Sequence, residues 1–282
     1  MKYCAVYGGM DYGKQERELT SGPVDVIAAT PGRLLDFAGR KKLSLDAVEV
    51  LVIDEADRML DMGFIPDIKR IIRLVPSKEK RQTLLFSATL SDDVMRLASA
   101  WMPNPQTIEI TPEKVEVDTV QQIVYIVTSK DKGTLLCNLL KRPAMERVLV
   151  FTNRRDEADY LAKNLQKHGI KCGLLSGAVD QAKRIHVLEA FRSGRCHVVV
   201  ATDVAARGLH IDAISHVINF DLPYEAEDYV HRIGRTARAG AAGIAISFAC
   251  EEESFVLPEI EKFIGHPLPM KQPEEDLLVP LR

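Results

Sequence analysis

Three carboxylate side chains, those of Asp54, Glu55 and Asp57, follow the apolar run at residues 50–53. Four apolar residues are too few for a helix and too continuous for a half-exposed strand, so they predict a strand buried on both faces of a parallel sheet. Ligands of open α/β sheets bind beyond the carboxyl ends of such strands. An Asp there can hold a nucleotide's magnesium through water, and a neighbouring Glu can orient or deprotonate the attacking water. The alternative is an ordinary acidic first turn of a helix.

Five further motifs of small, polar and basic residues recur along the chain, each at the end of an apolar run or the start of a helix-like segment. Any one of them is weak evidence, whereas all six in this order are strong evidence that they act together. In chain order the six are Thr30-Pro31-Gly32-Arg33, Asp54-Glu55-Ala56-Asp57, Ser87-Ala88-Thr89, Gln181-Ala182-Lys183-Arg184, Ala201-Thr202-Asp203-Val204-Ala205-Ala206-Arg207-Gly208 and His231-Arg232-Ile233-Gly234-Arg235-Thr236-Ala237-Arg238-Ala239-Gly240.

The elements that position these motifs alternate between short apolar runs and amphipathic stretches of helical period. This alternation predicts βαβ units and a parallel sheet. The helix-like stretches include residues 58–74, 156–168 and 181–191. The apolar runs are residues 24–29, 50–53, 84–86, 148–151, 198–201, 216–220 and 244–248.

A proline-punctuated, charged and non-periodic stretch at residues 103–118 interrupts this alternation and indicates a linker between two α/β units. We therefore expect a first domain at residues 1–110, a linker at 111–118 and a second domain at 119–268. Four prolines follow residue 265, so residues 269–282 are expected to form an extended tail.

The composition of the chain limits the number of domains and the kinds of partner that these motifs can serve. The chain has 282 residues, is 46% hydrophobic and carries a net charge of −3, so two domains are expected and any nucleic-acid contacts must be local. No secretory signal and no apolar run of about 18 residues is visible, which predicts a cytoplasmic location. Five scattered cysteines, without metal-site spacing, are expected to be reduced core residues: Cys4, Cys137, Cys172, Cys196 and Cys250.

Taken together, the six motifs resemble those of the DEAD-box RNA helicases of superfamily 2, and the resemblance covers essentially the whole chain. It implies two RecA-like parallel-sheet domains, ATP and Mg²⁺ as cofactors, and ATP hydrolysis coupled to local unwinding of RNA duplexes. Three stretches resemble more closely the bacterial RhlB type, the helicase of RNA-degrading assemblies: Arg207-Gly208-Leu209-His210-Ile211, Ala249-Cys250-Glu251-Glu252, and Leu257-Pro258-Glu259-Ile260-Glu261 leading to Ile264-Gly265-His266.

The resemblance assigns an ATP site to two acidic and two basic side chains. Asp54 binds magnesium through water and Glu55 activates the attacking water, while Arg235 and Arg238 reach the γ-phosphate. Guanidinium suits that task because it is permanently charged and forks onto phosphate oxygens. A solvated basic helix face is the alternative, but Gly234 and Gly240 interrupt such a stripe. The residues implied for ATP binding are Asp54, Glu55, Gly208, His210, Arg235 and Arg238.

The remaining motif residues are implied in coupling and in RNA binding. RNA contacts of the family go mainly to the sugar-phosphate backbone and so carry little sequence preference. As isolated residues, Thr30 and Thr202 would instead be helix caps. The coupling residues are Asp57, Ser87, Thr89 and His231, and the RNA-binding residues are Gly8, Gly9, Thr30, Gly32, Arg33, Gln181, Arg184 and Thr202.

Two positions depart from the family pattern. His210 stands where the family usually has an Asp that helps to hold the ribose, although the RhlB type also carries His there. Ala237 stands where Gly is common.

A phosphate-cradling P-loop is expected before Asp54 but is not apparent. Residues 8–15 satisfy the Gly-x4-Gly-Lys spacing, yet they place Gln15 where magnesium needs a hydroxyl, and Gly8-Gly9 matches a later, RNA-facing glycine doublet of the family. We therefore expect that the chain begins partway through its first domain, which is truncated and lacks the P-loop. Such a domain should expose apolar strand edges, which invite aggregation, and residues 1–110 should be marginal alone, whereas residues 119–268 should be stable.

Three hypotheses follow. The first is an ATP-dependent RNA helicase whose activity in this chain alone is uncertain. The second is a non-catalytic module that binds RNA or docks onto an RNA-degrading endonuclease scaffold, with no membrane partner. The third is an incomplete reading of a longer gene. RNA-dependent ATP turnover that disappears in Glu55→Gln would favour the first, and salt-sensitive RNA binding separates RNA binding from scaffold docking.

Overall fold

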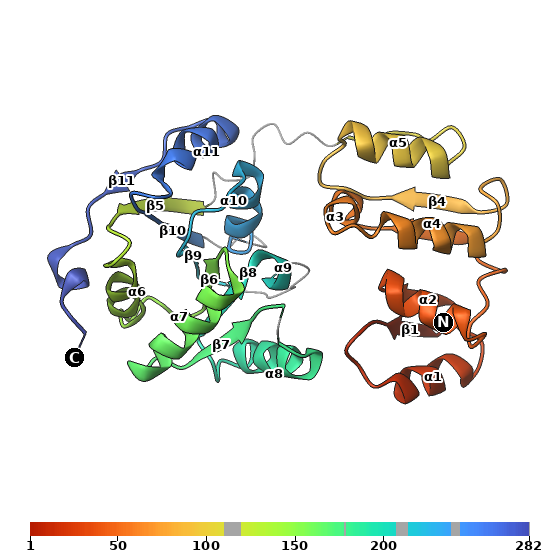
Figure 1. The fold of residues 1–282 in the computed structure, drawn as a ribbon, viewed down its shortest axis with the longest axis horizontal. Helices are drawn as coiled ribbons and strands as arrows, with labels where there is room; N and C mark the ends of the chain where they lie inside the picture. The colour runs from red at the N-terminus through yellow and green to blue at the C-terminus, as the bar shows by residue number, and fades with distance from the viewer. Residues whose placement is uncertain (110–119, 178, 207–213, 238–242, 282) are drawn as a thin grey trace. The chain divides into compact units, whose positions relative to one another are not determined.

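The computed structural model describes residues 1–109, 120–177, 179–206, 214–237 and 243–281, which form two compact units, Met1–Ile110 and Thr111–Arg282 (Figure 1). The linker expected at residues 111–118 lies outside the described residues. Both units are built from parallel strands joined by helices, so the α/β class expected from the alternating pattern is confirmed.

In unit 1, the strands form two separate parallel pairs. Tyr3 of β1 lies opposite Val26 of β2, and Val50 of β3 lies opposite Gln82 of β4. The strands are β1 (Tyr3–Val6), β2 (Val26–Ala29), β3 (Val50–Ile53) and β4 (Gln82–Leu85), and the helices are α1 (Tyr12–Thr20), α2 (Pro31–Gly39), α3 (Ala56–Asp61), α4 (Ile65–Leu74) and α5 (Asp92–Trp101).

The strand at residues 50–53 exists and is parallel, but the prediction that both of its faces are buried is wrong. Leu51 and Ile53 pack against helices α3 to α5, while Val50 and Val52 are 50% and 53% exposed. Alternate residues of a strand point to opposite faces, so β3 has one packed and one open apolar face. Unit 1 therefore exposes one apolar strand face, whereas the sequence predicts exposed apolar strand edges.

The helix-like stretch at residues 58–74 is two helices rather than one. Helix α3 ends at Asp61 and α4 begins at Ile65. Gly63 between them has φ +71°, a left-handed conformation that favours glycine, and Pro66 is in the first turn of α4, where its missing N–H costs nothing. The hydrophobic period continues across the break because both helices bury one face on the same core.

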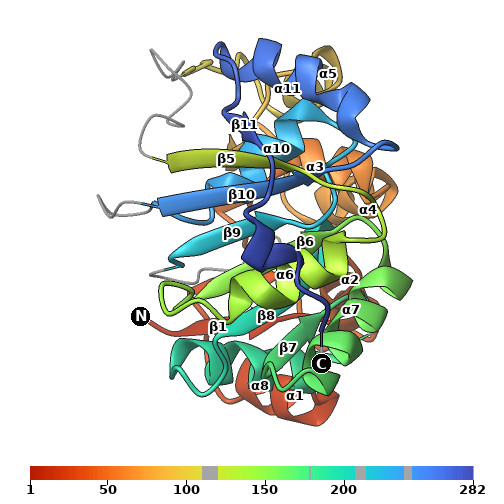
Figure 2. The ribbon, with the colours of Figure 1, turned by 90° about the vertical axis from the view of Figure 1, so that its left-hand side faces the viewer.

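Unit 2 has a single seven-stranded parallel sheet in the order β11-β5-β10-β9-β6-β8-β7 (Figure 2). Strands β6, β8 and β9 are buried along their whole length, as continuous apolar runs predict. The strands are β5 (Val120–Ile126), β6 (Val148–Thr152), β7 (Cys172–Leu175), β8 (Val198–Thr202), β9 (His216–Asn219), β10 (Gly243–Ala249) and β11 (Met270–Lys271).

Helices cover both faces of this sheet and make three layers (Figures 1 and 2). One face packs against α6 and α7, and the other against α8 to α11. The helices are α6 (Lys132–Leu140), α7 (Arg155–Lys167), α8 (Gln181–Arg192), α9 (Asp203–Ala206), α10 (Ala226–Ile233) and α11 (Leu257–Ile264), with 3-10 turns η2 (Ser254–Val256) and η3 (Glu275–Leu278). In the described part of the chain, no helix has the length and apolarity needed to cross a membrane.

The C-terminal segment is packed onto unit 2 over much of its length. β11 pairs with β5, and Leu277 is buried against the α6 core. The Asn138 side-chain amide donates to the carbonyl oxygens of Leu277 and Val279, at 3.0 and 2.9 Å. The proline content that predicts an extended tail gives no sign of these contacts.

Candidate functional site

The turn that follows β3 holds Asp54 and Glu55 in a strained backbone. Glu55 has φ +50° and ψ +50°, a left-handed conformation that costs a residue with a Cβ about 1–3 kcal/mol. Its N–H donates to Asp54 Oδ1 at 2.9 Å, and its carboxylate lies 3.2 Å from the Arg58 guanidinium. Both side chains are exposed beyond the carboxyl end of the strand, before helix α3 begins. The acidic pair is therefore a strand-end turn, and only Asp57 belongs to the first helical turn.

Asp57 connects the ends of β3 and β4. Its carboxylate accepts hydrogen bonds from the Thr89 N–H and hydroxyl, at 3.2 and 3.3 Å, and its own N–H donates to Ser87 Oγ at 3.2 Å. The structure thus brings together three of the four residues expected to couple hydrolysis to movement. These bonds join the segments that follow the two strands, and the coupling role stays a prediction.

The glycine doublet before α1 and the motif that starts α2 lie close together. Gln15 is buried and exchanges two hydrogen bonds with the Tyr7 backbone, and the Arg33 guanidinium lies 3.3 Å from Gln15 Oε1 and 3.4 Å from the Met10 carbonyl oxygen. Gln15 is therefore a structural residue, and α1 already begins at Tyr12, so residues 8–15 do not form a phosphate loop.

The local backbone explains part of this motif. Gly9 has φ +77°, which requires glycine, whereas a Cβ on Gly8 or Gly32 would meet no atom within 4 Å. Thr30 occupies the N-cap position of α2 but makes no side-chain cap hydrogen bond. Thr30 therefore stands at the cap position that the alternative predicts, but its side chain does not cap the helix.

In unit 2, the α8 motif contacts the segment that follows β8. The Arg184 Nη2 donates to the Ala205 carbonyl oxygen at 3.1 Å, while its Nε is buried without a hydrogen-bond partner among the described residues. Thr202 is buried at the end of β8, and Gln181 is the first residue of α8. Arg184 and Thr202 thus lie on neighbouring segments, and their contact with RNA stays a prediction.

The end of α10 carries the described part of the arginine motif. The Arg235 Nε donates to the His231 carbonyl oxygen at 3.1 Å, and His231 Nδ1 lies 4.0 Å from the Asp228 carboxylate. Ala237 has φ +55°, which explains in physical terms why glycine suits that position. Gly208, His210 and Arg238 lie outside the described residues.

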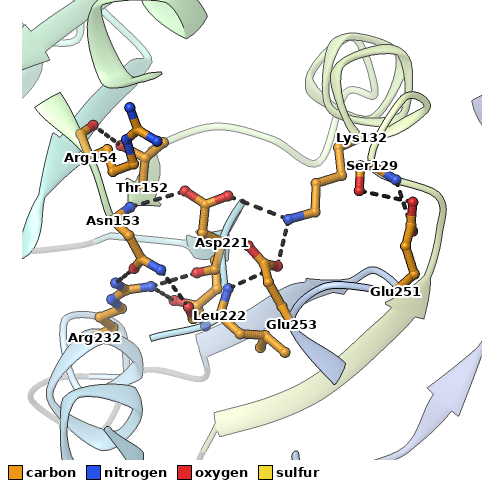
Figure 3. A network of polar contacts seen from close by, with 11 residues as sticks. Ser129, Lys132, Thr152, Asn153, Arg154, Asp221, Leu222, Arg232, Glu251 and Glu253 are labelled. Atoms are coloured by element: carbon orange, nitrogen blue, oxygen red, sulfur yellow. Dashed lines mark hydrogen bonds and ion pairs between the residues drawn. The ribbon is translucent and has the colours of Figure 1, made fainter. Parts of the chain in front are cut away.

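Arg232, to which the sequence analysis gave no role, is the most connected side chain of this region (Figure 3). It is 1% exposed and forms two hydrogen bonds of 2.7 Å to the Asp203 carboxylate. It also donates to Asn153 Oδ1 and to the Asp221 carbonyl oxygen, both at 2.6 Å. The sequence carries one signal of this burial: Arg232 follows Tyr229 by three residues and adjoins Ile233, so it lies on the apolar side of the helix.

Comparison with known proteins matches both units. The DEAD/DEAH box helicase model matches residues 1–97, and the helicase conserved C-terminal domain model matches residues 131–240. The ATP-dependent RNA helicase RhlB of Pseudomonas putida is 56% identical over 97% of this chain and 69% of its own length. The chain belongs to the DEAD-box ATP-dependent RNA helicases. The resemblance to the RhlB type is thereby confirmed, and the family's enzymes hydrolyse ATP.

Other relatives of this DEAD-box chain extend the comparison. RhlB of Xanthomonas axonopodis pv. citri is 49% identical over the whole chain, which spans 49% of that relative. The structure of S. cerevisiae Dbp5 bound to RNA and ADP BeF3 is 32% identical with a TM-score of 0.82, over 96% of this chain and 70% of that one. E. coli SrmB bound to regulator of ribonuclease activity A is 38% identical with a TM-score of 0.54, over 58% of this chain and 96% of that one. Two RecA-like domains, as expected, are the architecture of this family.

Proposed function

We propose that the chain serves an RhlB-type helicase that couples ATP hydrolysis to local unwinding of RNA in cytoplasmic RNA degradation. The observation that carries the proposal is the strained Asp54–Glu55 turn beyond β3, connected through Asp57 to the end of β4. Hydrolysis and movement need such a connection because events at the nucleotide must change the positions of other elements.

Each carboxylate has a distinct role in this mechanism. Glu55 orients the attacking water and accepts its proton, and its fixed turn presents the carboxylate beyond the strand end. Asp54 is exposed and offers oxygen ligands, which suits Mg²⁺ because this ion is bound by one or two carboxylates together with substrate phosphates. Bound Mg²⁺ supplies charge neutralisation at the phosphates. Arg235 and Arg238, with Gly208 and His210, complete ATP binding, and arginines in such positions contribute about 10³- to 10⁵-fold in rate.

RNA binding uses backbone contacts from both units. We assign it to Gly8, Gly9, Thr30, Gly32 and Arg33 of unit 1, and to Gln181, Arg184 and Thr202 of unit 2. Helix N-termini and cationic side chains favour phosphate, so little sequence preference is expected. His231 joins Asp57, Ser87 and Thr89 in coupling.

ATP turnover by these 282 residues alone is expected to be weak, because they contain no Gly-x4-Gly-Lys-Ser/Thr segment to cradle the phosphates. A malachite-green phosphate assay with and without RNA tests the proposal. RNA-dependent turnover that disappears in Glu55→Gln supports catalysis by Glu55. Turnover that persists in Glu55→Gln overturns that role.

A second candidate is a non-catalytic module that binds RNA or docks onto an endonuclease scaffold. The continuous, fully packed sheet of unit 2 favours it, since that unit has the core of an independent binding domain. Filter binding of RNA at about 50 and 200 mM salt distinguishes an RNA-binding module from a scaffold-docking one, because phosphate contacts weaken steeply with salt.

A further inference from the structure

A cavity of about 630 Å³ lies within unit 2, at the carboxyl ends of β5, β6, β9 and β10. It is lined by the turns that follow these four strands and by one side of α7. None of the residues assigned above to ATP, RNA or coupling lines it. Its volume falls in the range of pockets that hold a ligand or an anchoring side chain, about 300–1,000 Å³.

The inner wall of the cavity holds a buried ion-pair network (Figure 3). The Lys132 ammonium lies 2.6 Å from the Glu253 carboxylate and 3.4 Å from the Asp221 carboxylate. Burial lowers the pKa of Lys132, but its two carboxylate partners outweigh burial and raise it above the ordinary value. Lys132 therefore stays charged, and it is already shared between two anions.

A third carboxyl group, that of Glu157, forms no ion pair with any cation in the described ranges of the chain. Burial, and then the adjacent Asp221 carboxylate, raise the pKa of Glu157 to about 7. The guanidinium of Arg154, which also lines the cavity, lies 2.5 Å from Asp156 instead. The acidic, basic and histidine side chains of the lining are Lys130, Lys132, Arg154, Glu157, His168, Asp221, Glu252 and Glu253, and its other titratable residues are Tyr160, Tyr224 and Cys250.

Three aromatic side chains stand around this acidic wall with most of their surface in solvent. Tyr160 is 70% exposed, Tyr224 is 71% exposed and Phe255 is 76% exposed, and all three line the cavity. Exposed aromatic rings that gather on one concave surface are typical of an interaction site. The face of such a ring attracts a cation, and guanidinium in particular stacks on it.

We propose that this cavity is the docking site for a partner polypeptide that inserts an arginine side chain between the aromatic rings and toward Glu157 and Asp221. The added cation balances the third carboxylate, and the rings hold the apolar stem of the arginine and its neighbours. RNA is disfavoured because its phosphates would face four carboxylates, whereas two of the three lining cations, Lys132 and Arg154, are already paired with carboxylates. The inference gives a surface and a chemistry to the docking role proposed above.

Isothermal titration of the full chain with acetyl-Leu-Arg-Phe-amide tests the proposal, with the same peptide carrying neutral citrulline in place of arginine as the matched ligand. We expect the arginine peptide to bind at least about tenfold more tightly, which corresponds to about 1.4 kcal/mol. A cation beside Glu157 favours its ionised form, so binding at about pH 7 should release protons and give heats that depend on the buffer.

Variants locate the site. Glu157→Gln should weaken arginine-peptide binding about tenfold and abolish proton release, and Phe255→Ala should weaken binding of both peptides. Two control variants should change neither peptide affinity nor proton release: Glu189→Gln, which alters an exposed carboxylate of α8 outside the cavity, and Tyr3→Ala in unit 1. Circular dichroism melts confirm that each variant is folded.

Equal affinity for the two peptides, or no binding up to about 10 mM, overturns the proposal. Labelled decauridylate that loses affinity in Tyr160→Ala makes the cavity an RNA contact and also overturns it. The titrations contain neither ATP nor RNA, and malachite-green and filter assays are run on the same preparations. A failed docking site is therefore distinguishable from a failed helicase proposal.

Discussion

Single residues in this molecule hold conformations and charges that cost free energy. Glu55 adopts a left-handed backbone at the strand end, where glycine would be easier, and Arg232 is a fully buried guanidinium. Strained backbone persists only where the surroundings hold it, and such positions gather at functional sites. The strain at Glu55 therefore agrees with its proposed role in orienting water.

The buried guanidinium of Arg232 supports unit 2 through its hydrogen bonds to Asp203, Asn153 and the Asp221 carbonyl oxygen. Arg232→Ala leaves these partners without a donor, so it should lower the free energy of unfolding of unit 2 by about 3–5 kcal/mol. Urea unfolding followed by far-ultraviolet circular dichroism measures the change. The exposed Arg195→Ala, which removes one hydrogen bond to Ser193, should stay within about 0.5 kcal/mol. A loss for Arg232→Ala no larger than the control's contradicts the assignment.

Glu157 gives stability a pH dependence of defined sign. Its pKa is about 7 in the folded protein against an ordinary value of 4.5, so the folded chain binds this proton more tightly than the unfolded chain. The stability contributed by protonated Glu157 is present at low pH and is lost as the pH rises from the unfolded to the folded pKa.

Glu157→Gln removes that loss and should raise the thermal midpoint more at about pH 8 than at about pH 5. Calorimetric or dichroism melts at the two pH values measure the difference. Glu189→Gln should show a small change that is equal at both. A gain for Glu157→Gln that does not grow with pH would show that Glu157 is already ionised in the folded protein.

At the scale of elements, the left-handed backbone of Gly63 contributes to the break between α3 and α4. Gly63 has φ +71°, and a Cβ there meets open space, so the cost of substitution is conformational alone. Gly63→Ala should therefore destabilise unit 1 by about 1 kcal/mol. Gly39→Ala, at the helical end of α2 and also in open space, should be neutral or stabilising by up to about 1 kcal/mol.

The chain's one tryptophan, Trp101, is buried in α5, so its fluorescence reports the unfolding of unit 1. Urea titrations by this signal compare the two glycine variants directly. Equal effects of the two substitutions would contradict the role of the positive φ at Gly63.

Sequence patterns predict the elements better than the details of the site. The apolar runs locate the buried strands of unit 2, and the motif order leads to the family and to a shared role for Asp57, Ser87 and Thr89, whose hydrogen bonds only the structure reveals. The pattern does not reveal the open face of β3 or the two helices at residues 58–74, because hydrophobic period does not report which neighbours are present. The network of Arg232 is equally hidden, because its partners come from the ends of three different strands, β6, β8 and β9.

At the scale of the whole chain, the two units differ in how completely their strands are covered. Unit 2 has one seven-stranded sheet with helices on both faces, whereas unit 1 has two separate pairs and leaves Tyr3, Val26, Val50 and Val52 exposed to 46–78%. Exposed apolar strand surface gains no free energy from burial and invites association. Unit 1, residues 1–110, should thus be the less stable unit, and residues 119–268 the more stable.

This difference predicts two separate unfolding transitions. Trp101 fluorescence should change at a lower urea concentration than the main loss of circular dichroism, which comes largely from unit 2. Stepwise proteolysis should leave a protected fragment that begins near residue 119, since cleavage follows local opening. Coincident transitions, or a surviving N-terminal fragment larger than the C-terminal one, would show that the open strands of unit 1 do not weaken it.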